Sequence, residues 1–260
     1  MKLSALLNSL QDITKENELP TAYIVGGLPR DRILGVPPNL VKDIDITTGD
    51  ASSSVLATLV SSKWPNALFR LYDDGHSSID FKNIRLDFSN NFKIPGIVTE
   101  LKDMGIDDPS ELQKELFSRD FTINTLLQPM DLQNEPLDLT GKAIIDLKAK
   151  VIRTPINPEL TIGYDPRRIL RALKLAIKFD FSIDKELGKT IIKYRGSLQN
   201  ITLEHIKKQI NQMLRINSDK TIELLSKYKL LPIIPLSKLM QLEVVKRNMI
   251  QEILDGQEIF

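Results

Sequence analysis

The stretch from Tyr23 to Asp50 restricts the possible folds more than any other part of the chain. A short apolar run leads into Gly26 and Gly27, and after a Pro-Pro break the run "DIDIT" alternates polar and apolar residues. Residues i and i+2 of a strand point to the same face, so Asp43 and Asp45 place two carboxylates side by side. Glycine permits close approach of the backbone to a ligand, and the free N–H groups of a helix start attract phosphate. The stretch therefore predicts a strand, a glycine turn, a short helix and a second strand around one anionic ligand.

The carboxylate pair predicts a metal site. Two ionised carboxylates this close repel each other unless a cation lies between them, and Mg²⁺ is commonly held by one or two carboxylates together with substrate phosphates. Asp87, between the apolar residues Leu86 and Phe88, is expected to face the same side as a third acid. Three acids that hold two metal ions about 4 Å apart would support in-line nucleotidyl transfer. The alternative is that Asp43 only decorates a strand edge, because the D-x-D pattern is common.

Composition narrows the kind of metal and of phosphate site. The chain of 260 residues has no cysteine and only the histidines His76 and His205, so thiolate and His-rich metal sites are excluded and carboxylates must supply the ligands. It contains neither a P-loop motif nor the G-x-G-x-x-G pattern of dinucleotide-binding folds. Arg30 is expected to contact a triphosphate, and the alternative for its side chain is an ion pair with Asp31.

Charge is distributed unevenly along the chain. Residues 1–141 contain 13 Lys and Arg against 21 Asp and Glu, whereas residues 142–260 contain 22 against 13. A basic half favours a polyanionic partner, and the alternative is that Lys-rich helices are simply solvated. No apolar run approaches the roughly 20 residues of a membrane span, and the N-terminus lacks the long apolar core of a signal peptide. These features predict a cytoplasmic protein that does not bind membranes.

Periodicity predicts an α+β chain. Helices are expected at 3–17 and 51–63, a short helix at 29–35 with Gly35 at its end, and strands in "AYIV", "DIDITT", "ALFRLY", "SSIDF" and "IRLDFSN". Beyond about residue 108 the pattern becomes mostly helical. The expected helices there start near Ser, Thr or Asp and include "PSELQKELF", "DPRRILRALKLAIKF", "DKELGKTIIKY", "TLEHIKKQINQML", "SDKTIELLSKY" and, at 243–254, "EVVKRNMIQEIL".

Four ordered motifs carry a resemblance to a known family. The first is "GGLPRD" followed by Asp43 and Asp45, the second is "SRDFTIN" at 118–124, the third is "LDLTGKAIIDLKAKVIR" at 137–153, and the fourth is "YDPRRILRA" at 164–172. A weaker fifth, "EHIKKQI", begins at Glu204. Together they resemble the class II tRNA nucleotidyltransferase and bacterial poly(A) polymerase family. Ser118, Tyr164 and His205 depart from the family pattern, which has Arg, Glu and Arg at these places.

The resemblance implies a polymerase-β-like nucleotidyltransferase head with a mixed sheet at 1–137, a helical neck for nucleotide selection at 138–216, and a short partial body for RNA binding at 217–260. It implies template-independent addition of CMP and AMP to RNA 3′ ends, first of all CCA addition or repair on tRNA, with CTP, ATP and Mg²⁺ and release of pyrophosphate. Polyadenylation of RNA 3′ ends is the alternative within the family. A non-catalytic RNA- or nucleotide-binding relative is the alternative from another class.

The resemblance also implies roles for individual residues. Asp43, Asp45 and Asp87 are the expected catalytic acids, and the first two hold the metal. The expected nucleotide-binding residues are Gly26, Gly27, Arg30, Arg119, Asp120, Asn124, Asp165, Arg168 and Arg171. The expected RNA-binding residues are Lys174, Lys178, Lys207 and Lys208.

Each role has a structural alternative. Asp165 followed by Pro166 is also a typical helix N-cap, whereas in the family an Asp and an Arg at these places read the incoming base. Arg119 and Asp120 could form a buried ion pair. The basic stripe that runs from Arg167 to Lys178 could be a solvated helix face.

Overall fold

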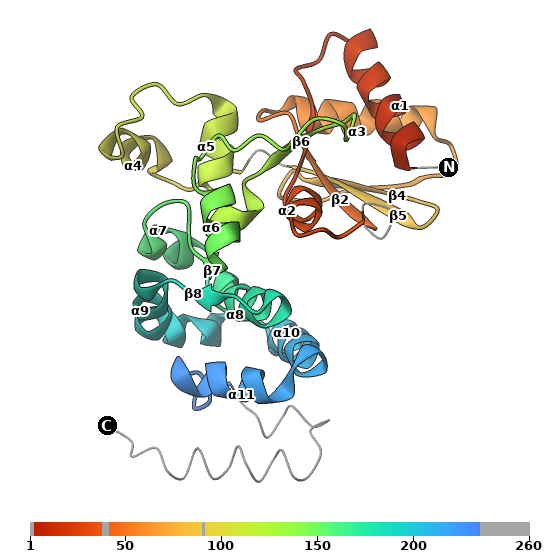
Figure 1. Ribbon diagram of the computed structural model, residues 1–260. Helices are drawn as coiled ribbons and strands as arrows, with labels where there is room; N and C mark the ends of the chain where they lie inside the picture. Colours follow the sequence, from red (N-terminus) through yellow and green to blue (C-terminus); the bar gives the residue numbers. More distant parts are fainter. Residues whose placement is uncertain (1–2, 38–41, 90–91, 235–260) are drawn as a thin grey trace. The chain divides into compact units, whose positions relative to one another are not determined.

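The structure is a computed structural model that describes residues 3–37, 42–89 and 92–234, and the helix expected at 243–254 lies outside these residues. The chain divides into a first compact unit that ends at Ala149 and a second that begins at Lys150 (Figure 1). The three-part division with boundaries at 137 and 216 stays a prediction. Each unit is described below by itself.

The first unit is built on a mixed sheet. Its described strands are β1 (Tyr23–Val25), β2 (Asp43–Thr47), β3 (Leu68–Leu71), β4 (Ser77–Phe81), β5 (Ile84–Phe88) and β6 (Leu127–Pro129). They lie in the order β3-β4-β5-β2-β1-β6, in which β2 and β5 are parallel and every other pair is antiparallel. The α+β class and the mixed sheet are therefore confirmed, and β6 is a strand that the pattern did not predict.

Two helices cover one face of this sheet (Figure 1). Helices α1 (Leu3–Glu16) and α3 (Ser52–Lys63) bury their apolar residues against alternate residues of the strands. On β2 these are Ile44 and Ile46, and on β5 Leu86 and Phe88, each at most 1% exposed. Since strand residues alternate between faces, this core turns the intervening residues of both strands, including the acids, to the opposite face.

The opposite face carries α5 (Glu111–Phe117). Its N-terminus is closed by a capping box in which Ser110 and Gln113 exchange side-chain and backbone hydrogen bonds. Leu116 of α5 packs with Val25 and Leu127 in a small buried cluster on this face. The other described helices of the unit are α2 (Gly27–Ile33), α4 (Ile97–Asp103), the 3-10 turn η2 (Thr122–Asn124) and α6 (Ala143–Ala149). Helix α2 begins two residues before the predicted start at Pro29.

The second unit is mostly helical, as predicted. Its described elements are β7 (Val151–Ile152), α7 (Pro158–Tyr164), α8 (Arg167–Phe179), β8 (Ser182–Ile183), α9 (Lys185–Tyr194), the 3-10 helix η3 (Arg195–Asn200), α10 (Leu203–Ile216) and α11 (Ser218–Lys227). Asp184 and Thr202 cap α9 and α10 as expected, and Asn217 rather than Ser218 caps α11. The parallel pair β7–β8 is too short to be recognised by alternation. No helix in the described part of the chain is both long and apolar enough to cross a membrane.

Candidate active site

Two adjacent strands bring the predicted acids together. In the parallel pair of β2 and β5, Asp45 lies opposite Asp87 and Asp43 lies opposite Arg85. Asp43 is exposed, whereas Asp45 and Asp87 are half-buried. The expectation that Asp87 shares a face with the carboxylate pair is confirmed, because Leu86 and Phe88 on either side of it are buried in the core.

The carboxylates on this face of the sheet are suitable ligands for a hard cation. The side chains of Asp43 and Asp45 offer only carboxylate oxygens, the ligands that Mg²⁺ prefers, and they lie two residues apart on one face of β2. Across residues 3–37, 42–89 and 92–234, no three Asp, Glu, His or Cys side chains converge as a ready metal site. The acids therefore fit a cation that is completed by substrate phosphates, and Mg²⁺ stays a prediction.

Gly26 lies beside the Asp45 carboxylate. Its backbone has φ of 79° and ψ of −120°, a conformation that side-chain-bearing residues rarely adopt. A β-carbon at this position would lie 2.4 Å from Oδ2 of Asp45 and 3.7 Å from Nη1 of Arg119. The glycine therefore lets the Asp45 carboxylate and the Arg119 guanidinium both approach the turn that leads into α2.

Arg30 joins the first motif to the second. Its side chain is buried, its Nε donates to Oδ1 of Asp31 at 2.7 Å, and its Nη1 donates to Oδ1 of Asn124 at 2.6 Å. Asn124 in turn donates to Oδ1 of Asp120 at 2.9 Å. The ion pair with Asp31, which was the alternative for Arg30, is present. Arg30, Asn124 and Asp120 are thus linked by hydrogen bonds and buried, with Asp31 half-buried at one end of the chain of contacts. Direct contacts of Arg30, Asp120 and Asn124 with a nucleotide stay predictions.

Arg85 is a site residue that the sequence interpretation did not include. Its Nε donates to both oxygens of Asp87, at 2.9 and 3.0 Å, and its Nη2 donates to the Tyr72 hydroxyl at 3.0 Å. Hydrogen bonds with Ser78 and Arg85 lower the pKa of that hydroxyl. Asp87 thus has a cationic partner that balances part of the negative charge of the three acids. Alternation on the strand could have revealed it, since Arg85 is two residues from Asp87.

Glu115 is the second residue that was missed. Its carboxylate is 3% exposed, and it accepts hydrogen bonds from the hydroxyls of Thr47 and Ser89 and from Nη2 of Arg119. The sequence signal for it is the i, i+4 spacing to Arg119, which places opposite charges on one helical face. Ser118, which stands where the family has Arg, is buried and accepts a hydrogen bond from the Ile94 backbone at 2.9 Å.

In the second unit, Asp165 is paired with Arg167. Its carboxylate accepts from the backbone N–H and from Nε and Nη2 of Arg167 at 3.0, 2.7 and 3.1 Å. The N-cap residue of α8 is Pro166, so Asp165 binds the first turn of the helix from one residue before the N-cap and not as the predicted N-cap. Arg168 is 9% exposed, whereas Tyr164 is half exposed. Whether Asp165 and Arg168 also read a base stays a prediction.

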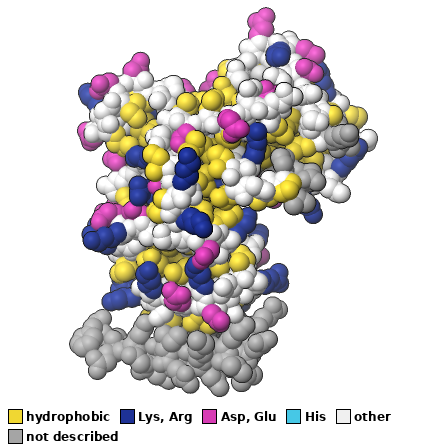
Figure 2. All heavy atoms as spheres, in the orientation of Figure 1, with side chains coloured by type: hydrophobic (Ala, Val, Ile, Leu, Met, Phe, Trp, Pro, Cys, Tyr) yellow, Lys and Arg dark blue, Asp and Glu magenta, His cyan; other side chains and the backbone are white. Residues whose placement is uncertain are grey.

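The predicted RNA-binding residues lie on α8 and α10, which pack together. Lys178 and Lys208 are exposed, whereas Lys207 and Lys174, which donates to Gln212 at 3.2 Å, are half-buried. Arg171, which is predicted to bind the nucleotide, is also exposed on α8. The apolar side of α8 is buried as expected. On the face seen in Figure 2, Lys and Arg side chains are spread over the second unit. Burial, and after it the charge of the neighbouring Arg167, lower the pKa of His205, while Asp165 acts in the opposite direction.

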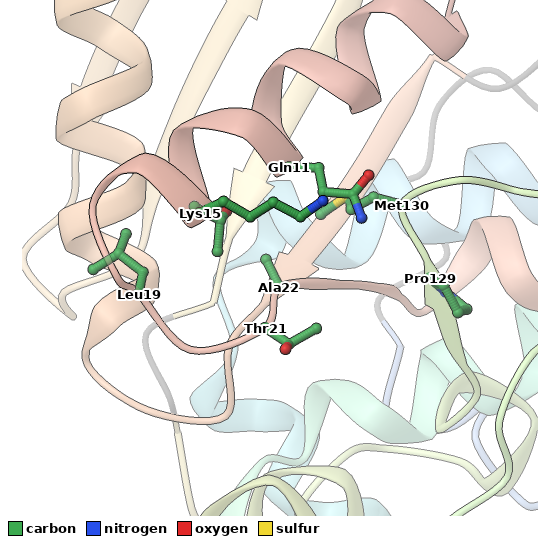
Figure 3. Close-up of a pocket in the computed structure, with 8 residues that line it drawn as sticks. Gln11, Lys15, Leu19, Thr21, Ala22, Pro129 and Met130 are labelled. Carbon is green, nitrogen blue, oxygen red and sulfur yellow. The ribbon is translucent and has the colours of Figure 1, made fainter.

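A separate small pocket lies on the first unit (Figure 3). Its volume is about 160 Å³, and Lys15, Thr21, Ala22 and Met130 are among its lining residues. These residues lie near the start of β1, whereas Gly26 follows its end. The pocket is lined by none of the predicted site residues.

Comparison with known proteins places this chain in a family. A family model of the poly A polymerase head domain matches residues 22–153, about half of the chain. The CC-adding tRNA nucleotidyltransferase of Halalkalibacterium halodurans is 31% identical over 193 residues, covering 74% of this chain and 44% of that protein. The A-adding tRNA nucleotidyltransferase of Aquifex aeolicus is 28% identical over 215 residues, covering 80% of this chain and 24% of that protein.

A solved structure of a CCA-adding enzyme with ATP superposes with a TM-score of 0.68 and 26% identity, and the match covers 87% of this chain and 50% of that one. The chain spans less than half the length of the curated relatives it matches. The match to the Halalkalibacterium halodurans protein and the match to the solved structure cover 74% and 87% of this chain, so each extends beyond the residues 22–153 that the head-domain model matches. The chain therefore belongs to the poly A polymerase head-domain family.

Proposed function

We propose that this chain catalyses template-independent addition of nucleotides to the 3′ end of RNA, with tRNA as the leading substrate and CTP and ATP as donors. The observation that carries the proposal is the Asp45 carboxylate, which lies over Gly26 and in register with Asp87. A triphosphate that approaches the glycine turn would meet these acids on the same face of the sheet. The relatives named as CC-adding and A-adding enzymes support the choice of tRNA.

The proposed reaction transfers a nucleotidyl group. The 3′-hydroxyl oxygen of the RNA attacks the α-phosphorus of the nucleotide, the bond to the β-phosphate oxygen breaks, pyrophosphate leaves and the hydroxyl proton is released. Asp43 and Asp45 would hold Mg²⁺, which would supply charge neutralisation and a lowered pKa for the attacking hydroxyl. Asp87, held in place by Arg85, is proposed as the third acid. Arg119 would contact the triphosphate.

Base selection is proposed for Asp165 and Arg168 and nucleotide contact for Arg171, as the family resemblance implies. A carboxylate accepts from an exocyclic amino group and an Arg donates to base acceptors, so the two together can match a base edge. Lys174, Lys178, Lys207 and Lys208 are proposed to contact the RNA backbone, which predicts binding that weakens with salt. A cytoplasmic location is part of the proposal.

The test is incorporation of single labelled nucleotides. The purified chain is incubated with Mg²⁺, each NTP in turn and a tRNA that lacks its 3′-terminal CCA. Ordered addition of CMP and AMP that stops at a fixed length supports CCA addition or repair, while a long AMP ladder on several RNAs supports polyadenylation instead. Asp43→Ala and Asp45→Ala are expected to abolish incorporation without loss of folding. Absence of incorporation of every NTP into every RNA would favour the non-catalytic relative and overturn the enzyme proposal.

A further inference from the structure

We infer that Glu115 is a positioning residue that aims the Arg119 guanidinium at the triphosphate site. The inference rests on the proposed function, since it requires a nucleotide triphosphate beside Asp45. Glu115 does not touch the proposed substrate position; it acts through Arg119. It is one of the few carboxylates of the described chain that are buried, with 3% of its surface exposed.

The Glu115 carboxylate accepts hydrogen bonds from three parts of the first unit: strand β2, the residue after β5 and the residues after α5. Its Oε2 accepts from the Thr47 hydroxyl on β2, its Oε1 accepts from the Ser89 hydroxyl at 3.0 Å, and the same Oε1 accepts from Nη2 of Arg119 at 2.8 Å. Thr47 is two residues beyond Asp45, and Ser89 is two residues beyond Asp87. Each hydroxyl therefore continues the row of residues that carries a catalytic acid.

A glycine, Gly49, allows α5 to come close enough to β2 for the contact between Glu115 and Thr47. Gly49 has φ of +79°, and a β-carbon there would lie 2.9 Å from the α-carbon of Leu112, one turn before Glu115 on α5. The glycine therefore lets the backbone of α5 approach the end of β2. Thr47 is fixed in the same turn, because its hydroxyl accepts a hydrogen bond from the Gly49 N–H at 2.9 Å.

The two terminal nitrogens of the Arg119 guanidinium have different surroundings. Its Nη2 is held by Glu115, while its Nη1 lies 3.7 Å from the β-carbon position that Gly26 lacks, beside the Asp45 carboxylate. A guanidinium is planar and rigid, so fixing one edge determines where the other edge points. A side chain that is already aimed loses less conformational entropy when it binds a phosphate. Glu115 therefore contributes to nucleotide affinity without contacting the nucleotide.

The test compares Glu115→Gln with a matched control on the same helix. Glu111→Gln removes a carboxylate that is paired with Lys93 and Lys114 but is about half exposed. Binding of ATP and CTP is measured by calorimetry in the presence of Mg²⁺ without RNA, and KM and kcat are measured in the incorporation assay. Glu115→Gln is expected to raise Kd and KM about 10-fold with kcat within about 3-fold, since a charge-assisted bond is lost. Glu111→Gln is expected to match the wild type.

A double variant separates positioning from folding. If Glu115 acts through Arg119, adding Glu115→Gln to Arg119→Gln changes nucleotide affinity by less than about 2-fold, and the shorter Glu115→Asp regains part of the affinity. A purely structural role would lower the melting temperature of both Glu115 variants and leave Kd and KM at wild-type values, which overturns the inference. A wild-type chain that binds no nucleotide would overturn the proposed function itself, so the two failures differ.

Discussion

Replacing Gly26 with alanine tests the proposed site directly, because the added methyl group both strains the backbone and displaces the Asp45 carboxylate. The first is backbone strain: at φ of 79° and ψ of −120° a non-glycine residue costs about 1–3 kcal/mol. The second is displacement: the new β-carbon would lie 2.4 Å from Oδ2 of Asp45, against an ordinary contact of 3.4 Å or more. The carboxylate must therefore retreat by about 1 Å, a misplacement that costs on the order of 100-fold in rate.

The two effects have separate assays. Strain lowers the melting temperature by about 2–4 °C for each kcal/mol in a unit of this size, which gives a fall of about 2–12 °C. Displacement lowers kcat for nucleotide incorporation, measured at a temperature where the variant is fully folded. Circular dichroism and single-turnover incorporation therefore report the two consequences independently.

Gly35→Ala is the matched control. Gly35 also has a positive φ, 81°, but nothing lies within 4 Å of its would-be β-carbon. It is expected to lose stability while keeping near wild-type incorporation. The reasoning is refuted if Gly26→Ala retains kcat within about 3-fold of the wild type, or if Gly35→Ala loses as much activity as Gly26→Ala.

Three further outcomes are expected. Asp165→Ala should cost about 1 kcal/mol of stability through loss of the hydrogen bond to the Arg167 N–H at the start of α8 and weaken the discrimination between CTP and ATP; unchanged selectivity in competition assays would leave this helix contact as its whole role. Arg85→Gln should tighten Mn²⁺ binding, followed by electron paramagnetic resonance, by about 3- to 10-fold because a neighbouring positive charge is removed; unaltered affinity would contradict the proposed charge balance around Asp87. The His205 imidazole should titrate below its ordinary pKa of 6.5, owing to burial and the Arg167 charge.

The sign of the His205 effect follows from linkage. Its folded pKa is depressed, so the unfolded chain binds the proton more readily, and the stability that neutral His205 contributes is present above pH 6.5 and is lost as the pH falls through the lower folded value. A bound polyanion should raise the folded pKa, which an NMR titration with and without RNA would detect. Identical titrations in both states would contradict the proposed RNA contact at α10.

The sequence predicted those parts of the fold that depend on local periodicity. Alternation placed Asp43, Asp45 and Asp87 on one face, and helical spacing located α8 with its buried apolar side, because each pattern is read within a few residues. Glu115 could not be assigned in this way. Its role depends on Thr47 and Ser89, which are remote in sequence and meet it only because α5 packs against the ends of two strands.

Arg30 illustrates the same limit. A basic residue after a glycine turn predicts phosphate contact, which stays a prediction. The burial of Arg30 and its bond to Asn124, 94 residues away, depend on the packing of η2 and cannot be derived from a local pattern. The strands β7 and β8 escaped prediction because they have only two residues each, too few to show a period. Strand β6, "LQP", lacks β-branched residues and ends in a proline, so it carries no strand signal of its own.

The parallel pairing of β2 with β5 has a practical consequence for labelling and sequence comparison. The separation of Asp45 from Asp87 is fixed by the spacing of neighbouring strands, about 4.8 Å between backbones, and not by the length of chain between them. The intervening β3–β4 hairpin lies at the outer edge of the sheet, and its turn at Asp73–Gly75 is exposed. Insertions there should leave the acids in register. Homologous chains can therefore differ greatly in this interval, and the turn offers a place for a fluorophore or an affinity tag.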